Sequence, residues 1–265
     1  MKDKNAWVVI AAAVVLVAFF AGYSLNPKTQ IQVSLPTPEP TFEPSATPTP
    51  FAENSFLVEE GFTKTISIDL PAVDKNNLGV LAKLNIEARN GNGKIYIDYS
   101  SGAPLLASDT QNSFLNAVDL AKEITGKTIE ETNLYYSLST DAQEVGGGSA
   151  GAATAVATAV LLSGKSIRKW YIITGSADRN GKIGKVGRIM EKAQAAKNAG
   201  YKVMLVPKGE AAVVVGKEKC VETSQGNAYS RVCNTVYEEE NVEEAVGIGI
   251  VEVETVEDAF SIMSG

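Results

Sequence analysis

The sequence predicts an α+β domain with a mixed sheet and packed helices, preceded by one transmembrane helix and a stalk rich in proline and threonine. Strand patterns dominate the first half of the globular part, and helix and strand patterns alternate in the second half. A hydrophobic content of 45% and a charged content of 21% are ordinary for a soluble fold. We expect residues 1–24 to form a cytoplasmic tip and membrane anchor, residues 25–53 a linker, and residues 54–265 one folded domain.

Strands and one long helix are expected in the first half of the globular part. Residues 62–70 alternate apolar and polar side chains, which predicts a strand. Residues 78–88 and 94–99 give two more strands, and the RNGNG turn between them predicts that they pair as a hairpin. Residues 108–124 place apolar side chains at helical spacing, and residues 134–138 predict a further strand.

Helices and strands alternate in the second half. A glycine run opens it, and an Ala–Gly pair gives a C-cap signal after its second helix. The expected order is helix 149–162, strand 169–175, a hairpin turning at Asn180 and Gly181, helix 189–198, strand 202–206 and helix 256–263.

The N-terminal segment has the composition of a membrane anchor. Residues 6–23 are uncharged and almost all apolar, and at about 1.5 Å per residue a helix of this length spans a bilayer with slight thinning. Lys2 and Lys4 precede the segment, which favours a cytoplasmic N-terminus, although Lys28 on the other side weakens this bias. A cleaved signal peptide is the alternative, and both interpretations place the rest of the chain outside the cytoplasm.

Two further features fit an extracytoplasmic domain on a single-pass membrane protein. Residues 36–50 read PTPEPTFEPSATPTP, a composition that forms an extended, semi-rigid stalk rather than a core. Cys220 and Cys233 lie in one polar segment, and a disulfide between them would fit an oxidising compartment. The alternative is two unrelated thiols.

The composition excludes several kinds of chemistry. The chain has no histidine, so neither a Ser–His–Asp site nor a histidine metal site is possible. Two cysteines are too few for a zinc cluster, and we expect no cofactor. A net charge of -7 argues against nucleic acid as a partner. Any acyl transfer must therefore use Lys, Asp, Glu or the terminal amine as its base.

A glycine-rich segment, residues 145–159, reads VGGGSAGAATAVATA and is the most informative part of the chain. The glycines permit a tight turn, after which Ser149 stands at the start of a helix with its hydroxyl exposed. Free N–H groups at this helix start can stabilise an oxyanion, so we assign the oxyanion loop to Gly147, Gly148 and Ala150. The alternative is that Ser149 is only an N-cap after a flexible loop.

Four short segments occur in the order in which a known family carries them. They are NGNGKI at residues 90–95, GGSAG at 147–151, ITG at 173–175 and VGRIMEKAQAAKNAG at 186–200. The proteolytic domain of Lon proteases has a PGKGKL-like turn, a GPSAG nucleophile loop, an MTG strand end and the pattern G-G-L-K-E-K-x-x-A-A. The chain therefore resembles the Lon proteolytic domain, and residues 215–237 look like an insertion relative to it.

The resemblance implies a catalytic dyad. The catalytic lysine of the family pattern falls on Lys192, and Lys192 follows Ser149 by 43 positions, as in Lon enzymes. Ser149 would be the nucleophile, and Thr174 would hold the lysine amine by a hydrogen bond. A lysine is a base only when neutral, and burial beside Ile189 and Ala193 would lower its pKa. The alternative is an ordinary exposed helix lysine.

The chain departs from the family near the serine. Many Lon proteins have an acidic residue just before the nucleophile, whereas here the nearest acids are Glu144 and Asp141. The family's carboxylate next to the serine therefore has no counterpart at these positions. Lys182 and Lys185 compete as bases, but both flank glycines in a hairpin, which favours solvated side chains.

These features predict an ATP-independent endopeptidase that cuts peptides or unfolded protein segments outside the membrane. The sequence has no Walker GxxxxGK[ST] motif, so we expect no ATP binding, and the resemblance implies a possible homo-oligomeric ring. One alternative is a non-catalytic scaffold or binding module on the same fold. Another is a small-molecule kinase of the galactokinase–homoserine kinase type, whose phosphate loop is also rich in glycine.

Overall fold

The computed structural model describes residues 55–59, 61, 63–98, 105–140, 144–145, 147–225 and 228–265. The predicted anchor and stalk lie outside these ranges. Within them, no helix combines the length and the apolar character needed to cross a membrane. The residues from Pro50 to Gly265 form one compact unit, which contains every described element.

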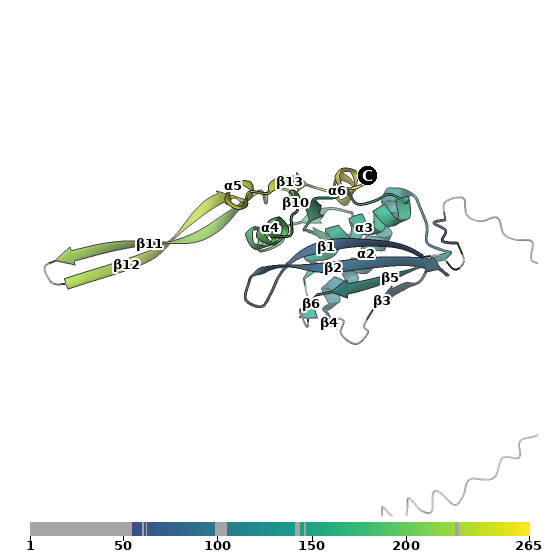
Figure 1. The fold of residues 1–265 in the computed structure, drawn as a ribbon, viewed down its shortest axis with the longest axis horizontal. Helices are drawn as coiled ribbons and strands as arrows, with labels where there is room; N and C mark the ends of the chain where they lie inside the picture. Colours follow the sequence, from purple (N-terminus) through teal and green to yellow (C-terminus); the bar gives the residue numbers. More distant parts are fainter. Residues whose placement is uncertain are drawn as a thin grey trace, which may run out of the picture. The chain divides into compact units, whose positions relative to one another are not determined.

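The first sheet is mixed, as predicted, and has the order β1-β2-β5-β3 (Figure 1). Its strands are β1 (Thr63–Val73), β2 (Gly79–Asn90), β5 (Thr132–Ser139) and β3 (Ile95–Ile97). The first three pair antiparallel, and β3 runs parallel to β5. The short turn 74–78 joins β1 to β2 in a hairpin, and this turn lies at one end of the sheet.

The prediction that β2 and β3 pair as a hairpin is wrong, because β5 lies between them. The side chain of Asn133, at the start of β5, accepts hydrogen bonds from the N–H groups of Asn92 (3.0 Å) and Lys94 (2.9 Å). A Cβ on Gly91 would clash with the same Asn133 side chain. The glycine-rich turn therefore wraps around a side chain of β5 instead of closing a two-stranded hairpin.

Two helices supply most of the core beside this sheet. Helix α2 (Ser108–Thr125) packs on α3 (Gly151–Ser163), and α3 also contacts β1 and β2. The residues of α3 from Gly151 to Leu162 are all buried, which fits a helix that is apolar on every side. Tyr136 of β5 shares a hydrogen bond of 2.9 Å with Thr158 of α3 and stacks on Phe114 of α2. Helix α3 is thus fixed on every side, and so is the loop that precedes it.

The strands of a second sheet are all parallel. The sequence patterns did not predict that these strands form a sheet of their own. The sheet has the order β13-β10-β7, with β13 at Gly249–Val253, β10 at Val203–Pro207 and β7 at Tyr171–Ile173. Helix α4 (Ile189–Asn198) has the predicted bounds, and so does α6 (Val256–Met263), which begins with a capping box. The remaining short elements are β4 (Leu105–Leu106), β6 (Glu144–Val145), β8 (Ser176–Ala177), β9 (Ile183–Gly184), η1 (Gly148–Ala150) and α5 (Val242–Val246).

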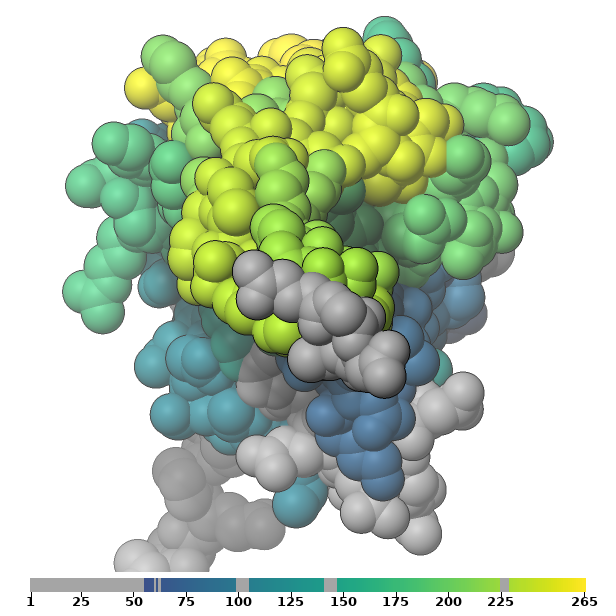
Figure 2. Space-filling view, turned by 90° about the vertical axis from the view of Figure 1, so that its left-hand side faces the viewer, coloured from purple at the N-terminus to yellow at the C-terminus, as the bar shows by residue number. Residues whose placement is uncertain are grey.

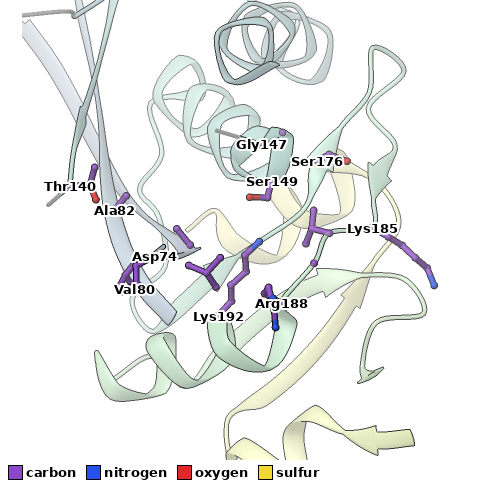
Figure 3. A pocket seen from close by; sticks show the side chains of 15 residues that line it. Asp74, Val80, Ala82, Thr140, Gly147, Ser149, Ser176, Lys185, Arg188 and Lys192 are labelled. Atoms are coloured by element: carbon purple, nitrogen blue, oxygen red, sulfur yellow. The ribbon is translucent and has the colours of Figure 1, made fainter. Parts of the chain in front are cut away.

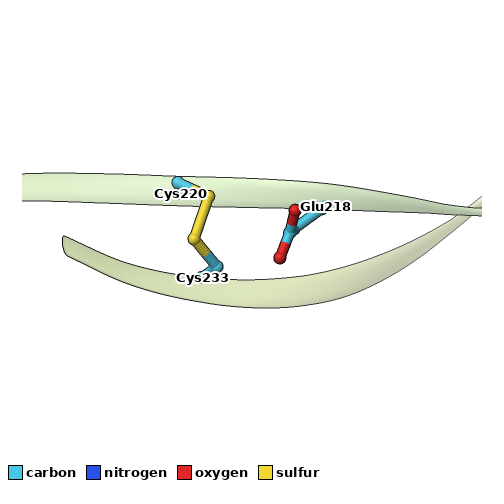
Figure 4. Close-up of side chains that lie close together, drawn as sticks. All are labelled: Glu218, Cys220 and Cys233. Atoms are coloured by element: carbon cyan, nitrogen blue, oxygen red, sulfur yellow. A yellow bond between two sulfur atoms is a disulfide. The ribbon is translucent and has the colours of Figure 1, made fainter.

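A long two-stranded ribbon extends from the rest of the domain (Figure 1). Figure 2 looks along this ribbon, whose yellow-green residues lie in front of the other elements. Strands β11 (Ala212–Gln225) and β12 (Ala228–Asn241) pair with each other and, among the described residues, with no other strand. We call residues 212–241 the arm; it contains the insertion predicted from the sequence. Cys220 lies opposite Cys233 and the two form a disulfide, which confirms that prediction. Glu218 lies beside the sulfurs (Figure 4), but disulfide-bonded sulfurs are not thiolate ligands for a metal.

Candidate active site

The loop before α3 holds Ser149 by its backbone. Gly147 has a φ of 93°, a left-handed conformation that favours glycine, and its carbonyl accepts a hydrogen bond from the Thr110 hydroxyl of α2 (3.4 Å). The Ser149 carbonyl accepts the N–H of Gly175 (3.1 Å), and Ala152 donates its N–H to the Gly175 carbonyl (3.0 Å). The serine loop is therefore tied to the strand end that carries Thr174.

The helix predicted to begin at Ser149 opens with the 3₁₀ turn η1, and α3 follows from Gly151. The first N–H groups of such a turn have no acceptor within the helix and point out of its end. Gly147 and Gly148 line the cavity together with Ser149, whereas Ala150 is half-buried at the start of α3. A Cβ on Gly151 would lie 2.8 Å from the backbone nitrogen of Ala177, so glycine is required where α3 approaches β8.

The side chain of Lys192 is buried and points toward Ser149 (Figure 3). Only 4% of the residue is exposed, so the alternative of an exposed helix lysine is wrong. Its Nζ donates a hydrogen bond of 3.3 Å to Oγ1 of Thr174, which is fully buried. The neighbours Ile189 and Ala193 are also buried, as the spacing on α4 predicted.

Burial changes the protonation of this lysine. Desolvation lowers the pKa of Lys192 to about 8, while the negative charges of Glu210 and Glu191 act in the opposite direction. Near neutral pH a useful fraction of the amine is therefore neutral and can accept a proton. Glu210 was missed by the sequence reasoning, because it lies 18 positions after Lys192 and outside every matching motif.

Ser149 and Lys192 line one cavity of about 460 Å³. The described residues provide no hydrogen-bond partner for the Ser149 hydroxyl, which is half-buried at the cavity wall. Contacts between a nucleophile and its base are often long before substrate binds. The arrangement can therefore activate a hydroxyl for attack on a carbonyl, with a base that is not histidine.

The competing lysines are both exposed. Lys185 lies at the rim of the cavity, but its side chain points away from Ser149 (Figure 3) and its Nζ donates to the carbonyl of Gly209 (3.1 Å). Lys182 is exposed in the β8–β9 hairpin, whose turn at Asn180–Gly181 matches the prediction. Neither lysine is buried beside the serine. Among the three lysines, Lys192 alone has the environment of a base.

The opposite wall of the cavity was missed by the sequence reasoning. It is formed by apolar side chains at the turn end of the β1–β2 hairpin, and Val186 lines the facing wall from the loop before α4. The hairpin residues are Ala72, Val73, Val80 and Ala82. Val80 and Ala82 lie in a predicted strand, whereas Ala72 and Val73 lie beyond the predicted end of the first strand at residue 70. Only the pairing of β1 with β2 and the contact with α4 bring these residues beside Ser149.

Comparison with known proteins identifies the family. The family model described as the Lon protease (S16) C-terminal proteolytic domain matches residues 84–250. Lon protease 2 of Syntrophobacter fumaroxidans is 34% identical over 119 residues, which cover 44% of this chain and 15% of that protein. The Lon protease of Citrifermentans bemidjiense is 33% identical over 95 residues, which cover 36% of this chain and 12% of that protein.

The chain belongs to the Lon protease (S16) proteolytic-domain family. Membership in this family implies a serine peptidase. The matched segment spans less than a sixth of the length of each of these two relatives, so the activities of the whole relatives do not transfer directly.

Proposed function

We propose that this protein is an ATP-independent endopeptidase in which Ser149 is the nucleophile and Lys192 its general base. The observation that carries the proposal is the buried amine of Lys192, which points toward the Ser149 hydroxyl inside one cavity. Its lowered pKa supplies a base that works near neutral pH without histidine. Family membership supports the reaction class, which is peptide-bond hydrolysis.

The reaction begins when the neutral Nζ of Lys192 takes the proton from Oγ of Ser149. The oxygen attacks the scissile carbonyl, and the N–H groups of the turn formed by Gly147, Gly148 and Ala150 receive the developing oxyanion. The lysine ammonium returns its proton to the leaving amine, which leaves an acyl-enzyme on Ser149. Lys192 then takes a proton from water, whose oxygen attacks the ester carbonyl. The bond from this carbon to Oγ breaks, the lysine ammonium returns the proton to Oγ of Ser149, and the acid product leaves. The hydrogen bond to Thr174 keeps the amine in place throughout.

Substrates are peptides or unfolded protein segments. The cavity of about 460 Å³ has room for a few residues of an extended chain, not for a folded domain. The printed sequence contains no Walker motif, which supports cleavage without ATP. The disulfide of the arm supports an oxidising compartment outside the membrane, and family membership supports assembly into a homo-oligomeric ring.

The test uses the full chain in detergent with an unfolded protein substrate, in the presence and absence of ATP. Mass spectrometry reads the products of the parent, of Ser149→Ala and of Ser176→Ala. Ser176 also lines the cavity and serves as the matched control. We expect fragments from the parent and from Ser176→Ala with or without ATP, and none from Ser149→Ala. Equal fragmentation by Ser149→Ala would contradict the assignment of the nucleophile.

A further inference from the structure

Arg188 occupies a position that suits glycine better than arginine. It precedes α4 as its N-cap residue, and its φ of 63° lies in the left-handed region. In this region a residue with a Cβ has an unfavourable steric contribution to its free energy, which glycine does not have. The family pattern G-G-L-K-E-K has a second glycine here, whereas this chain reads G-R-I-M-E-K from Gly187 to Lys192. This chain therefore has an arginine at a backbone position that favours glycine.

The guanidinium of Arg188 joins two separate elements. Its Nη1 donates to Oε1 of Glu191 (3.1 Å) in the first turn of α4, and its Nη2 donates to Oδ1 of Asn77 (3.0 Å). Asn77 lies in the β1–β2 turn and is itself left-handed, with a φ of 60°. Two residues with left-handed backbones are thus linked by a hydrogen bond. We call this pair the Arg188–Asn77 clasp.

The clasp spans the two walls of the cavity beside Ser149. The β1–β2 hairpin supplies one wall, with Val73 and Val80, and the loop before α4 supplies the other, with Val186. A Cβ on Gly79 would clash with the carbonyl of Glu191, so the walls are already in close contact at this end. The clasp therefore adds a side-chain link between the two walls to this backbone contact.

The backbone of Arg188 is also hydrogen-bonded to the backbone of Lys192. The carbonyl of Arg188 accepts the N–H of Lys192 (3.1 Å), so the left-handed conformation starts the helix on which the lysine stands. The charge of Arg188 is already neutralised by Glu191, which argues against a role in binding an acidic substrate group. A role in the shape of the cavity remains.

We propose that the Arg188–Asn77 clasp fixes the width of the cavity and restricts the substrate side chain that enters it to small aliphatic groups. This inference rests on the proposed peptidase function. The apolar side chains that line the two walls are all alanine or valine, and Asp74, Thr140 and Ser176 also line the cavity. Among the described residues, no large aliphatic or aromatic side chain lines it, so the apolar part of the space lies between short side chains. Loss of the clasp would let the β1–β2 turn move away from α4 and admit larger side chains.

The first test compares kcat/KM for peptides that differ only in the residue whose side chain would enter the cavity. This residue is alanine, valine, leucine or phenylalanine. We expect Arg188→Gly and Asn77→Ala each to reduce the preference for small over large side chains by about tenfold. The double variant should show no further reduction, because both changes break the same contact. Asn77→Asp keeps an oxygen acceptor for the guanidinium and should keep the parent's preference. Unchanged ratios in both single variants, or an equal loss of rate for every peptide, would overturn the proposal.

A second measurement does not depend on cleavage. Hydrogen exchange of the amides in residues 74–80 is followed in the full chain carrying Ser149→Ala, with and without the clasp substitutions. We expect faster exchange with Arg188→Gly and with Asn77→Ala, and parent-like exchange with Asn77→Asp. Unchanged exchange in all variants would overturn the clasp even if peptides were cut. A parent that cut no peptide, with exchange that responds as expected, would instead contradict the proposed function and the selectivity that rests on it.

Discussion

The body of the domain and the arm hold their structure in different ways. The body buries every residue of α3 except the last, and Leu162 near its end is only 2% exposed. On the arm, the facing residues Val221 and Val232 are 65% and 56% exposed. The arm carries half of the large hydrophobic side chains that are exposed in the described ranges: Val214, Val221, Tyr229, Val232, Val236 and Tyr237.

The difference shows which part of the chain stabilises the site. Burial of apolar surface positions Ser149 and Lys192 within the body. The arm relies on its backbone ladder, its disulfide and exposed ion pairs such as Lys219–Glu238. Each exposed ion pair contributes little. A two-stranded ribbon is only marginally stable alone. Changes in the arm should therefore leave the chemistry intact, whereas changes around α3 and α4 should not.

The largest expected effect concerns the base. Lys192→Met keeps the length of the side chain but removes the amine, and we expect activity to fall by about 10⁴-fold or more. The same variant should be more stable than the parent, with a free energy of unfolding higher by about 1–2 kcal/mol at pH 7. The reason is that an apolar group replaces a buried charge. Peptide cleavage and urea denaturation measure the two effects. Lys182→Met is the matched control, since Lys182 is exposed, and should change neither.

A pH series sharpens the same point. The folded-state pKa of Lys192, about 8, lies below the ordinary value of 10.5, so the unfolded chain binds more protons between these two pH values. The contribution of this lysine to the free energy of unfolding therefore rises as pH increases through this window, and it is constant well below pH 8. We expect the difference between the parent and Lys192→Met to shrink as the pH rises. A constant difference would show that Lys192 titrates normally in the folded chain.

Truncation of apolar side chains compares the two regions directly. Leu162→Ala should lower the free energy of unfolding by about 2–5 kcal/mol, because it leaves a cavity in the core. Val221→Ala on the arm should change it by no more than about 0.5 kcal/mol, because its side chain is exposed. Urea denaturation measures both values. Equal losses would mean that the arm is covered in solution, by a partner or a second copy.

The smallest expected effect on catalysis comes from the disulfide. Replacing Cys220 and Cys233 by serine should destabilise the pairing of β11 and β12 by about 3 kcal/mol in the chain-entropy model. Faster hydrogen exchange within the arm should report this loss. The kcat/KM for a short peptide should stay within about twofold of the parent, which is well below the tenfold step that 1.4 kcal/mol of barrier would produce. A large loss of peptide cleavage would show that the arm takes part in the site.

The sequence predicted local features well and non-local ones poorly. The bounds of α4 and α6 follow from apolar spacing and capping signals, which act within a few residues. The pairing of β3 depends on Asn133, about 40 positions beyond the turn that it fills, and turn chemistry alone therefore gave the wrong partner. The oxidised cysteine pair was foreseen because both cysteines lie in one short segment.

The candidate site shows the same division. Ser149, Thr174 and Lys192 were found through short motifs and their spacing, and the structure brings the three into one region. Glu210 and the clasp could not be found in this way. Glu210 affects Lys192 only through the fold, and the left-handed φ of Arg188 is invisible in a sequence unless glycine marks it.

The most direct test of the dyad follows covalent labelling of the full chain by a fluorophosphonate, which reacts with activated serines. Peptide mapping identifies the labelled residue, and the labelling rate is measured from pH 6 to pH 10. We predict that Ser149 is labelled and that the labelling rate rises with pH through about 8, where Lys192 loses its proton. Lys192→Met should show almost no labelling. Labelling of another residue, or equal labelling of Ser149 in Lys192→Met, would contradict the account.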